Sequence, residues 1–391
     1  MDIGRICKAR GRTPFALLRH PCEQRLPRSF IKLSSSSSAS LFSCKSKNIA
    51  ALTFNSNSDS RGRRHLCGVS NSWRSRMDVA PLQTAQADFP ISETFFRNAL
   101  ASMEKTYLSK NLTVSSVLDF VRTYDGGQVC YDHFAFRTFN VDNCGISALA
   151  QFFLDFGYIT RGELSFPGKH LRALWFSPPQ HLLDCNGEGV NGPLPRIFIS
   201  ELLVDKLSPE SQAIIKKYTS ISSGGSKYAA LASVLGSLTW PTPLLSDYHR
   251  LARESEYAAW TLVNGYALNH LTISVHRLKS DVQKIGKLNE LIQSNKFKLN
   301  TEGGILKVSP DGRLLQSSTV ADSMVFHFAE GISESVPASY IEFAERLVLP
   351  EYENLSVDKI LELHRRDGFE VGNADKIFES TSAEQLRRKV A

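Results

Sequence analysis

The 391-residue sequence contains no run of about 18 consecutive apolar residues, so it excludes a transmembrane helix. Cysteine is scarce after residue 77, where only Cys130, Cys144 and Cys185 remain, and no two cysteines have C-x-x-C spacing. This pattern supports neither a zinc ribbon nor a disulfide framework, and we interpret the three cysteines as small buried apolar residues. The hydrophobic content of 42% is nevertheless enough for a folded core in most of the chain.

Acidic residues are rare in residues 1–77, which hold 11 Arg, 4 Lys and 15 Ser against three acids, a net charge of +12. The rest of the chain carries −5, so the overall charge of +7 does not indicate nucleic-acid binding. A segment rich in Arg and Ser and poor in acids is typical of an organellar transit peptide. We therefore predict that residues 1–77 are a disordered transit peptide, although a solvated tail would have a similar composition.

We expect cleavage of this leader between about residues 60 and 80. The serine run at residues 34–38 favours a plastid (chloroplast or amyloplast stroma) as the destination, with the mitochondrion as the alternative. The acidic remainder and the absence of an apolar span predict no nucleic-acid partner and no membrane association.

The chain after residue 89 has the same order of elements twice. Apolar spacing predicts helices at 93–107, 114–123, 145–156 and 278–294, and strands at 129–139, 171–176, 196–204, 268–276, 306–308, 313–319, 324–328 and 340–347. A strand, a helix and several strands therefore occur in 89–205 and again in 266–391, around a helical insert at 206–265. We predict an α+β fold in which two βαβββ modules pair their sheets around a shared central site.

Three strands each carry one candidate metal ligand. Side chains alternate between the two faces of a strand. His133 therefore shares its face with Ala135 and Arg137. In the other two strands, His270 shares its face with Thr272 and Ser274, and Glu342 shares its face with Tyr340 and Ala344. Two imidazoles and a carboxylate can form a facial triad that leaves positions open on a divalent metal, usually Fe(II), for a chelating substrate and O₂. From the pattern alone, a lone histidine in a strand is more often a structural residue than a metal ligand. We interpret His327, on the face of Val325, as a core residue or one that supports the ligands.

Arg137 is the second feature of the first of these strands. Arg137 lies two pleats from His133, about 13 Å along the backbone. Its side chain can lean back towards the metal, which leaves a gap of a few ångströms between the guanidinium and the metal. That gap would suit a dicarboxylate with one end on the metal and its far carboxylate held bidentately by the guanidinium. A strand arginine on the surface is the alternative.

Six segments together resemble one protein family, the 2-oxoadipate dioxygenase/decarboxylases, which includes bacterial enzymes and plant plastid relatives. The resemblance covers about residues 90–385 and is carried by YDHFAFRTF (131–139), ALNHLTISV (267–275), YIEFAER (340–346), FPGKHLRALWFSPP (166–179), RIFISELLVD (196–205) and GNADKIFEST (372–381).

This resemblance implies a vicinal-oxygen-chelate-like fold with Fe(II) bound by His133, His270 and Glu342. It implies that Arg137 is the catalytic and substrate-binding residue that holds the distal carboxylate, with Gly372 and Asn373 near the substrate. The run 340–346 also resembles the Glu-bearing strand of 4-hydroxyphenylpyruvate dioxygenases. By that likeness the C-terminal motif is a lid helix over the site.

The implied reaction converts 2-oxoadipate and O₂ to 2-hydroxyglutarate and CO₂ in lysine catabolism. The partners are then a small 2-oxo dicarboxylic acid and O₂, and the sequence makes no prediction of the oligomeric state. One alternative keeps the triad but uses Zn²⁺ or Ni²⁺ in a glyoxalase-like lyase or isomerase. The other is a non-catalytic plastid protein that supports starch or amyloplast development.

Overall fold

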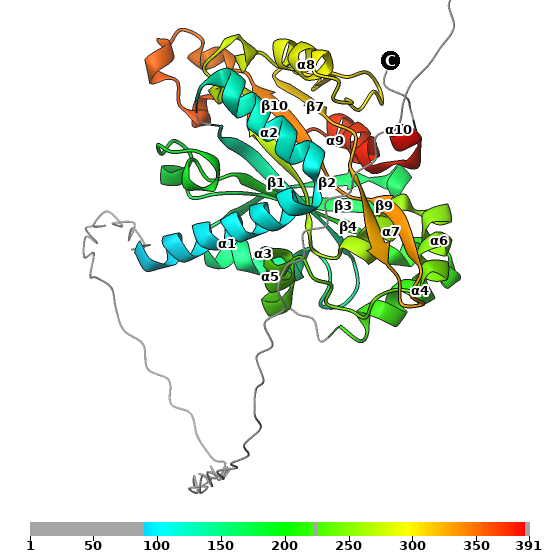
Figure 1. Cartoon of the computed structure of the whole chain (residues 1–391). Coiled ribbons are helices and arrows are strands. Elements are labelled where there is room, and N and C mark those ends of the chain that lie inside the picture. Colours follow the sequence, from blue (N-terminus) through cyan, green and yellow to red (C-terminus); the bar gives the residue numbers. More distant parts are fainter. Residues whose placement is uncertain (1–89, 128, 223–225, 388–391) are drawn as a thin grey trace, which may run out of the picture. The chain divides into compact units, whose positions relative to one another are not determined.

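The computed structural model describes residues 90–127, 129–222 and 226–387 (Figure 1). The predicted transit peptide, residues 1–77, lies outside these residues. Within the described part of the chain, no helix is both long and apolar enough to cross a membrane.

One mixed sheet of eight strands forms the framework, in the order β2-β3-β4-β1-β5-β10-β7-β6, and a separate hairpin pairs β8 with β9. The four central strands β4, β1, β5 and β10 are buried along their whole length, as expected of strands covered on both faces. The strands are β1 (Tyr131–Phe139), β2 (Ile159–Phe166), β3 (Leu171–Ser177), β4 (Arg196–Leu202), β5 (Leu268–Ser274), β6 (Lys307–Val308), β7 (Leu314–Ser318), β8 (Ser323–His327), β9 (Ser333–Pro337) and β10 (Tyr340–Arg346).

The sheet consists of two halves with the same connectivity. In one half β1 lies parallel to β4, followed by β3 and β2; in the other β5 lies parallel to β10, followed by β7 and β6. The halves join where β1 pairs antiparallel with β5, with Ala135 opposite His270. The predicted α+β fold with two paired βαβββ halves is confirmed. The predicted boundaries of the modules and of the insert stay predictions.

The helices cover the sheet and its ends (Figure 1). Helix α3 packs on β4, α7 on β1, and α8 on β7 and β10, while four helices lie in the chain between β4 and β5. The helices are α1 (Pro90–Lys110), α2 (Leu112–Asp125), α3 (Ile146–Asp155), α4 (Pro209–Thr219), α5 (Ser226–Leu235), α6 (Leu245–Glu254), α7 (Glu256–Asn264), α8 (Ile285–Ser294), α9 (Val371–Ile377) and α10 (Ala383–Arg387).

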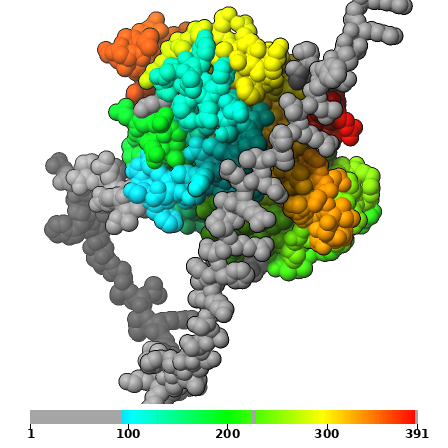
Figure 2. Space-filling view, viewed as in Figure 1, coloured from blue at the N-terminus to red at the C-terminus, as the bar shows by residue number. Residues whose placement is uncertain are grey.

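Helix α2 shows how the local sequence determines these elements. Val114, Val117, Leu118 and Val121 recur at helical spacing and are the apolar residues that the helix buries. The helix ends at Gly126, whose φ of +61° is left-handed and favours glycine. In Figure 2, α1 and α2 (blue to cyan) lie on the visible face, and the turns of residues 350–364 (dark orange) project at its edge.

Three sequence-based expectations are wrong in detail. The helix expected at 278–294 begins only at Ile285, because the buried Asp125 carboxylate accepts hydrogen bonds from the backbone N–H groups of Lys279 and Ser280 and holds them in a turn. Strands β2 and β9 were not expected, and both are largely exposed. His327 is exposed on the β8–β9 hairpin, where it bonds to Ser333, so it is neither a core residue nor a neighbour of the ligands.

Candidate metal centre and substrate site

Three adjacent strands, β1, β5 and β10, bring His133, His270 and Glu342 together. Nε2 of His270 lies 3.1 Å from Oε2 of Glu342, Nε2 of His133 lies 3.6 Å from the same oxygen, and the two nitrogens are 3.4 Å apart. All three side chains are buried. Their ligand atoms lie within 4.8 Å of one another, which is close enough to share one ion.

The chemistry of the donor set fits a divalent cation. Burial alone would raise the pKa of Glu342, but the adjacent His133 and His270 lower it to about 2, so the carboxylate is ionised. Burial lowers the pKa of His270 to about 4, so this imidazole is neutral at pH 7. An ionised carboxylate and a neutral imidazole are the forms that bind metals, and a His₂-carboxylate set leaves positions open.

Each histidine is oriented by the residue that precedes it. Oδ1 of Asp132 accepts a hydrogen bond from Nδ1 of His133 at 2.8 Å, and Oδ1 of Asn269 does the same for Nδ1 of His270 at 2.9 Å. The proton on Nδ1 leaves Nε2 of both rings free to bind a metal. Thr272 Oγ1 lies 3.0 Å from Nε2 of His133, so its hydroxyl adjoins the candidate ligands.

Two β-bulges explain how adjacent residues of a strand can meet in this way. The pairing of β1 with β5 is irregular at two places. One lies between Tyr131 and His133 in β1, and the other lies between Leu268 and His270 in β5. The extra residue is Asp132 in one bulge and Asn269 in the other. A bulge turns its extra residue out of the regular alternation, so each Asx side chain reaches the imidazole of the next residue.

Glu342 is held by a chain of two amides. Nε2 of Gln316 on β7 donates to Oε1 of Glu342 at 2.7 Å, and Nδ2 of Asn373 on α9 donates to Oε1 of Gln316 at 3.0 Å. The free carboxylate oxygen, Oε2, is the one that faces both imidazoles. The predicted substrate residue Asn373 is therefore buried behind the metal ligand, whereas Gly372 lies on the exposed side of α9.

Apolar side chains enclose the three ligands. The ring of Phe369 packs edge-on against His133, and the ring of Tyr340 stacks on His270 with 4.7 Å between centroids. Phe198, Ala374, Ile377 and Phe378 complete the lining of a narrow cavity. An environment of this kind excludes water from a bound ion and strengthens electrostatic interactions.

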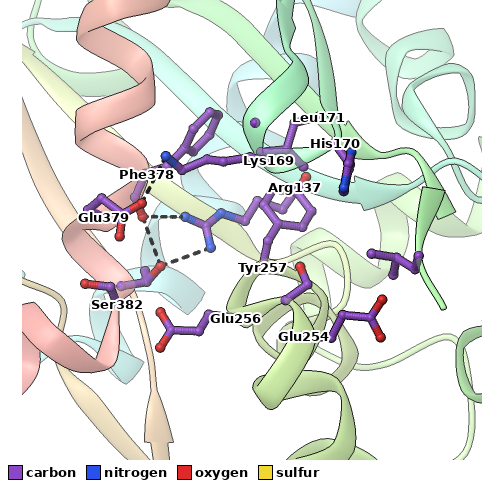
Figure 3. Close-up of a pocket in the computed structure, with 14 residues that line it drawn as sticks. Arg137, Lys169, His170, Leu171, Glu254, Glu256, Tyr257, Phe378, Glu379 and Ser382 are labelled. Atoms are coloured by element: carbon purple, nitrogen blue, oxygen red, sulfur yellow. Dashed lines mark hydrogen bonds and ion pairs between the residues drawn. The ribbon is translucent and has the colours of Figure 1, made fainter. Parts of the chain in front are cut away.

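Arg137 lies at the base of a second, outer pocket of about 300 Å³ (Figure 3). The pocket is formed by the turn at 168–171, the start of α7 and the C-terminal turn Phe378–Thr381. Phe378 lines both this pocket and the metal cavity, so the two cavities adjoin at this residue. Lys169 at the rim forms ion pairs with Asp375 and Glu379.

The guanidinium of Arg137 is a buried cation without an anion. One terminal nitrogen donates to Thr381 Oγ1 (3.1 Å), the other to the carbonyl of Phe378 (3.3 Å), and the Arg137 Nε has no hydrogen-bond partner among the described residues. The rings of Tyr257 and Trp260 lie 5.0 Å from its central carbon. No described carboxylate lies within ion-pair distance of the Arg137 guanidinium. Burial lowers the pKa of Arg137, because the buried charge is removed from water. Such a site favours the binding of an anionic ligand.

Sequence reasoning missed four of these residues: Asp132, Asn269, Gln316 and Tyr340. The first two had a signal, because an Asx residue immediately precedes each candidate histidine. Gln316 and Tyr340 carried none, since their contacts depend on the register of β10 with β7 and with β5.

Comparison with known proteins agrees with this architecture. The family model for 2-oxoadipate dioxygenase/decarboxylase matches residues 99–362. The chain belongs to this family. A rice relative named chloroplastic/amyloplastic 2-oxoadipate dioxygenase/decarboxylase is 64% identical over 80% of this chain and 85% of its own length. An Arabidopsis thaliana relative, the chloroplastic 2-oxoadipate dioxygenase/decarboxylase, is 60% identical over 84% of this chain and 89% of its own length.

Solved structures give the same result. The rice hydroxyglutarate synthase, determined in complex with 2-oxoadipate, is 65% identical with a TM-score of 0.75 and aligns over 76% of this chain and 96% of its own. A Shewanella frigidimarina protein described as a putative hydrolase is 31% identical with a TM-score of 0.57, over 70% of this chain and 98% of its own. The predicted 2-oxoadipate dioxygenase/decarboxylase family, and with it an enzyme, is confirmed. Both plant relatives carry plastid names, which supports a plastid and gives the mitochondrial alternative no support.

Proposed function

We propose that this chain binds Fe(II) through His133, His270 and Glu342 and converts 2-oxoadipate and O₂ to 2-hydroxyglutarate and CO₂. The equation balances in atoms without a further reductant. Bound Fe(II) would supply open coordination positions and the redox chemistry of O₂. The reaction would place the protein in lysine catabolism in the plastid stroma, after removal of residues 1–77.

The observation that carries this proposal is a metal-ligand triad with a buried, anion-free arginine nearby on the same strand. His133 and Arg137 are both on β1, four residues apart, and their side chains point to the same side of the sheet. A dicarboxylate could therefore meet the metal with its 2-oxo acid end and Arg137 with its far carboxylate. Holding both ends fixes which carbon faces the reacting centre, and orientation of this kind contributes strongly to rate.

The protein's own residues do the remaining work. Asp132 and Asn269 hold the proton on Nδ1 of each histidine, and Gln316 fixes the carboxylate of Glu342. Phe369 and Phe378 exclude water around the ligands. Thr381 and Phe378 bring the C-terminal segment onto Arg137, so this segment would close over a bound substrate.

The test is anaerobic reconstitution of the full chain with Fe(II), followed by O₂ uptake with 2-oxo acids of different length. We expect uptake with 2-oxoadipate, one CO₂ and one 2-hydroxyglutarate per O₂, and little uptake with monocarboxylic 2-oxohexanoate. Product formation without O₂ uptake would instead indicate the glyoxalase-like lyase or isomerase.

The role of Arg137 is tested with Arg137→Met, which removes the charge and keeps much of the side-chain volume. Loss of charged hydrogen bonds should lower kcat/KM for 2-oxoadipate by about 100-fold while Fe(II) binding is unchanged. Arg250→Met, which alters a more exposed arginine paired with Glu210, is the control. Full activity of Arg137→Met on 2-oxoadipate would contradict the role.

A further inference from the structure

Tyr340 lies between the metal ligands and Arg137. It begins β10, two residues before Glu342 and on the same face, and the parallel register places it opposite His270. Its ring stacks on the His270 imidazole with an angle of 26° between the planes and packs against Ile377 of α9. The side chain is fully buried, with an exposed fraction of 0%.

The hydroxyl of Tyr340 is an orphaned polar group. Neither this oxygen nor Nε of Arg137 has a hydrogen-bond partner among the residues that the structure describes. The two side chains lie close enough for a hydrogen-bonding contribution to each other's pKa, but the contact lacks the geometry of a normal hydrogen bond, so each group keeps capacity for a ligand. Buried polar groups are satisfied in the great majority of cases, so two orphans at one place indicate a missing ligand.

Both orphaned groups are donors. A phenol has an ordinary pKa of about 10, so the Tyr340 hydroxyl carries its proton at neutral pH and can donate it. The terminal nitrogens of Arg137 are already engaged with Thr381 and Phe378 of the C-terminal segment. Nε is therefore the nitrogen of Arg137 that makes no hydrogen bond to a described residue, and the donor beside it is the phenol.

We propose that the Tyr340 hydroxyl and the Arg137 Nε together bind the distal carboxylate of the substrate. In this arrangement the terminal nitrogens of Arg137 hold the C-terminal segment, and the Nε edge and the phenol hold the anion. Tyr340 then determines specificity for dicarboxylic over monocarboxylic 2-oxo acids. This proposal rests on the proposed function, because the dicarboxylate is its ligand.

The test compares Tyr340→Phe with the wild type, since this change removes the hydroxyl and keeps the ring that stacks on His270. Binding of 2-oxoadipate and of 2-oxohexanoate, which has the same chain length but no distal carboxylate, is measured anaerobically on the Fe(II)-loaded chain. We expect Tyr340→Phe to weaken 2-oxoadipate binding by about 10-fold to 100-fold and to leave 2-oxohexanoate and Fe(II) binding unchanged.

Thermal unfolding of the metal-free chain gives an independent readout. Because the Tyr340 hydroxyl has no partner without substrate, Tyr340→Phe should keep or raise the wild-type Tm. The control is Tyr158→Phe, a buried tyrosine whose hydroxyl donates to the carbonyl of Pro195 at 2.9 Å and which lines neither the Arg137 pocket nor the metal cavity. This control should lower the Tm and leave the binding of both acids unchanged.

Two outcomes would overturn the proposal. Equal weakening of both acids would mean that the hydroxyl acts at the 2-oxo acid end, and unchanged 2-oxoadipate binding would mean that it contacts no substrate. Failure of the proposed function is distinguishable, because the wild type would then bind 2-oxoadipate without O₂ uptake or would not bind it.

Discussion

The Asp132 carboxylate joins the predicted metal ligand His133 to the buried guanidinium of Arg346. It accepts from Nδ1 of His133 at 2.8 Å and from Nε and a terminal nitrogen of Arg346 at 2.6 and 2.9 Å. Burial alone would raise the pKa of Asp132, but Arg346 holds it well below its usual range. Because Arg346 is on β10, four residues after Glu342, one carboxylate connects the two strands that carry these ligands.

The first prediction concerns Asp132→Asn. The amide cannot neutralise Arg346, and breaking a buried ion pair at one partner costs about 3–5 kcal/mol of the free energy of unfolding. Asparagine keeps an acceptor oxygen for Nδ1 of His133, as Asn269 does for His270, but it loses the charge that strengthens this bond, so we expect Fe(II) affinity to fall about 10-fold. Urea unfolding of the metal-free chain and Fe(II) titration measure the two effects.

The control for this prediction is Asp205→Asn, which alters an exposed ion pair with Lys206. Its effect should be within about 0.5 kcal/mol of the wild type, with no change in Fe(II) affinity. If Asp132→Asn lost stability but bound Fe(II) as the wild type does, Asp132 would support the fold alone.

A second prediction separates orientation from charge, using Asn269→Ala. Asn269 accepts from Nδ1 of His270 but belongs to no ion pair, so its loss should cost only about 1 kcal/mol of stability. Fe(II) affinity should still fall by about 10-fold, because the tautomer and ring of His270 are no longer held. The same two measurements apply.

Asn289→Ala is the matched control, since Asn289 is also buried and accepts a hydrogen bond, here from Ser317 at 2.7 Å. It should lose similar stability and keep the Fe(II) affinity of the wild type. Equal Fe(II) affinities of the two variants would refute the orienting role of Asn269.

The fold was largely predictable because apolar residues alternate with polar ones along its central strands. Leu271 and Ile273 in Leu268–Ser274, and Ile341 and Phe343 in Tyr340–Arg346, give the period of two that predicts a strand. The edge strand Ile159–Phe166 is largely exposed and includes Gly162, so it lacked that signal. The shortened helix at 285–294 depends on Asp125, more than 150 residues earlier, and no local pattern reveals that contact.

The candidate ligands were predictable from family resemblance, but their supporting residues were not. Strict alternation predicts that Asp132 points away from His133, and only the bulge reverses this. The bonds of Gln316 to Glu342 and of Arg137 to Thr381 join residues distant in sequence. Contacts of this kind follow from sheet register and from the docking of the C-terminal segment, which periodicity does not specify.

A third prediction addresses Gln316, which links Glu342 to the C-terminal helix α9. In Gln316→Leu, Oε1 of Glu342 loses its donor and Asn373 loses its acceptor. We expect Fe(II) affinity to fall by about 10-fold or more, and α9 to become more accessible to protease in the metal-free chain. Gln293→Leu, at an exposed position of α8, should change neither measurement. Lower Fe(II) affinity with unchanged proteolysis would refute the link to α9.

A fourth prediction follows from Lys307, which is buried at an exposed fraction of 1%. Its ammonium donates to the carbonyls of Asn300 and Ile305, and burial lowers its pKa to about 8, although Glu342 and Glu302 oppose the shift. Below pH 8 both the folded and the unfolded chain carry this proton, so the penalty for burying the charge is constant. Between pH 8 and about 10.5 only the unfolded chain keeps the proton, so the penalty is progressively relieved as the pH rises.

The free energy of unfolding of the wild type should therefore rise relative to Lys307→Met between pH 8 and 10.5, by up to about 3 kcal/mol. Urea unfolding of both metal-free chains at pH 7, 8, 9 and 10 measures this difference. The test uses only how the difference in the free energy of unfolding changes with pH. The difference at any one pH also includes the loss of the donor for two carbonyls in Lys307→Met. Lys206→Met, at an exposed position, should keep a constant offset from the wild type, since its charge stays in water. A constant offset for Lys307→Met as well would show that the buried amine does not release its proton on folding.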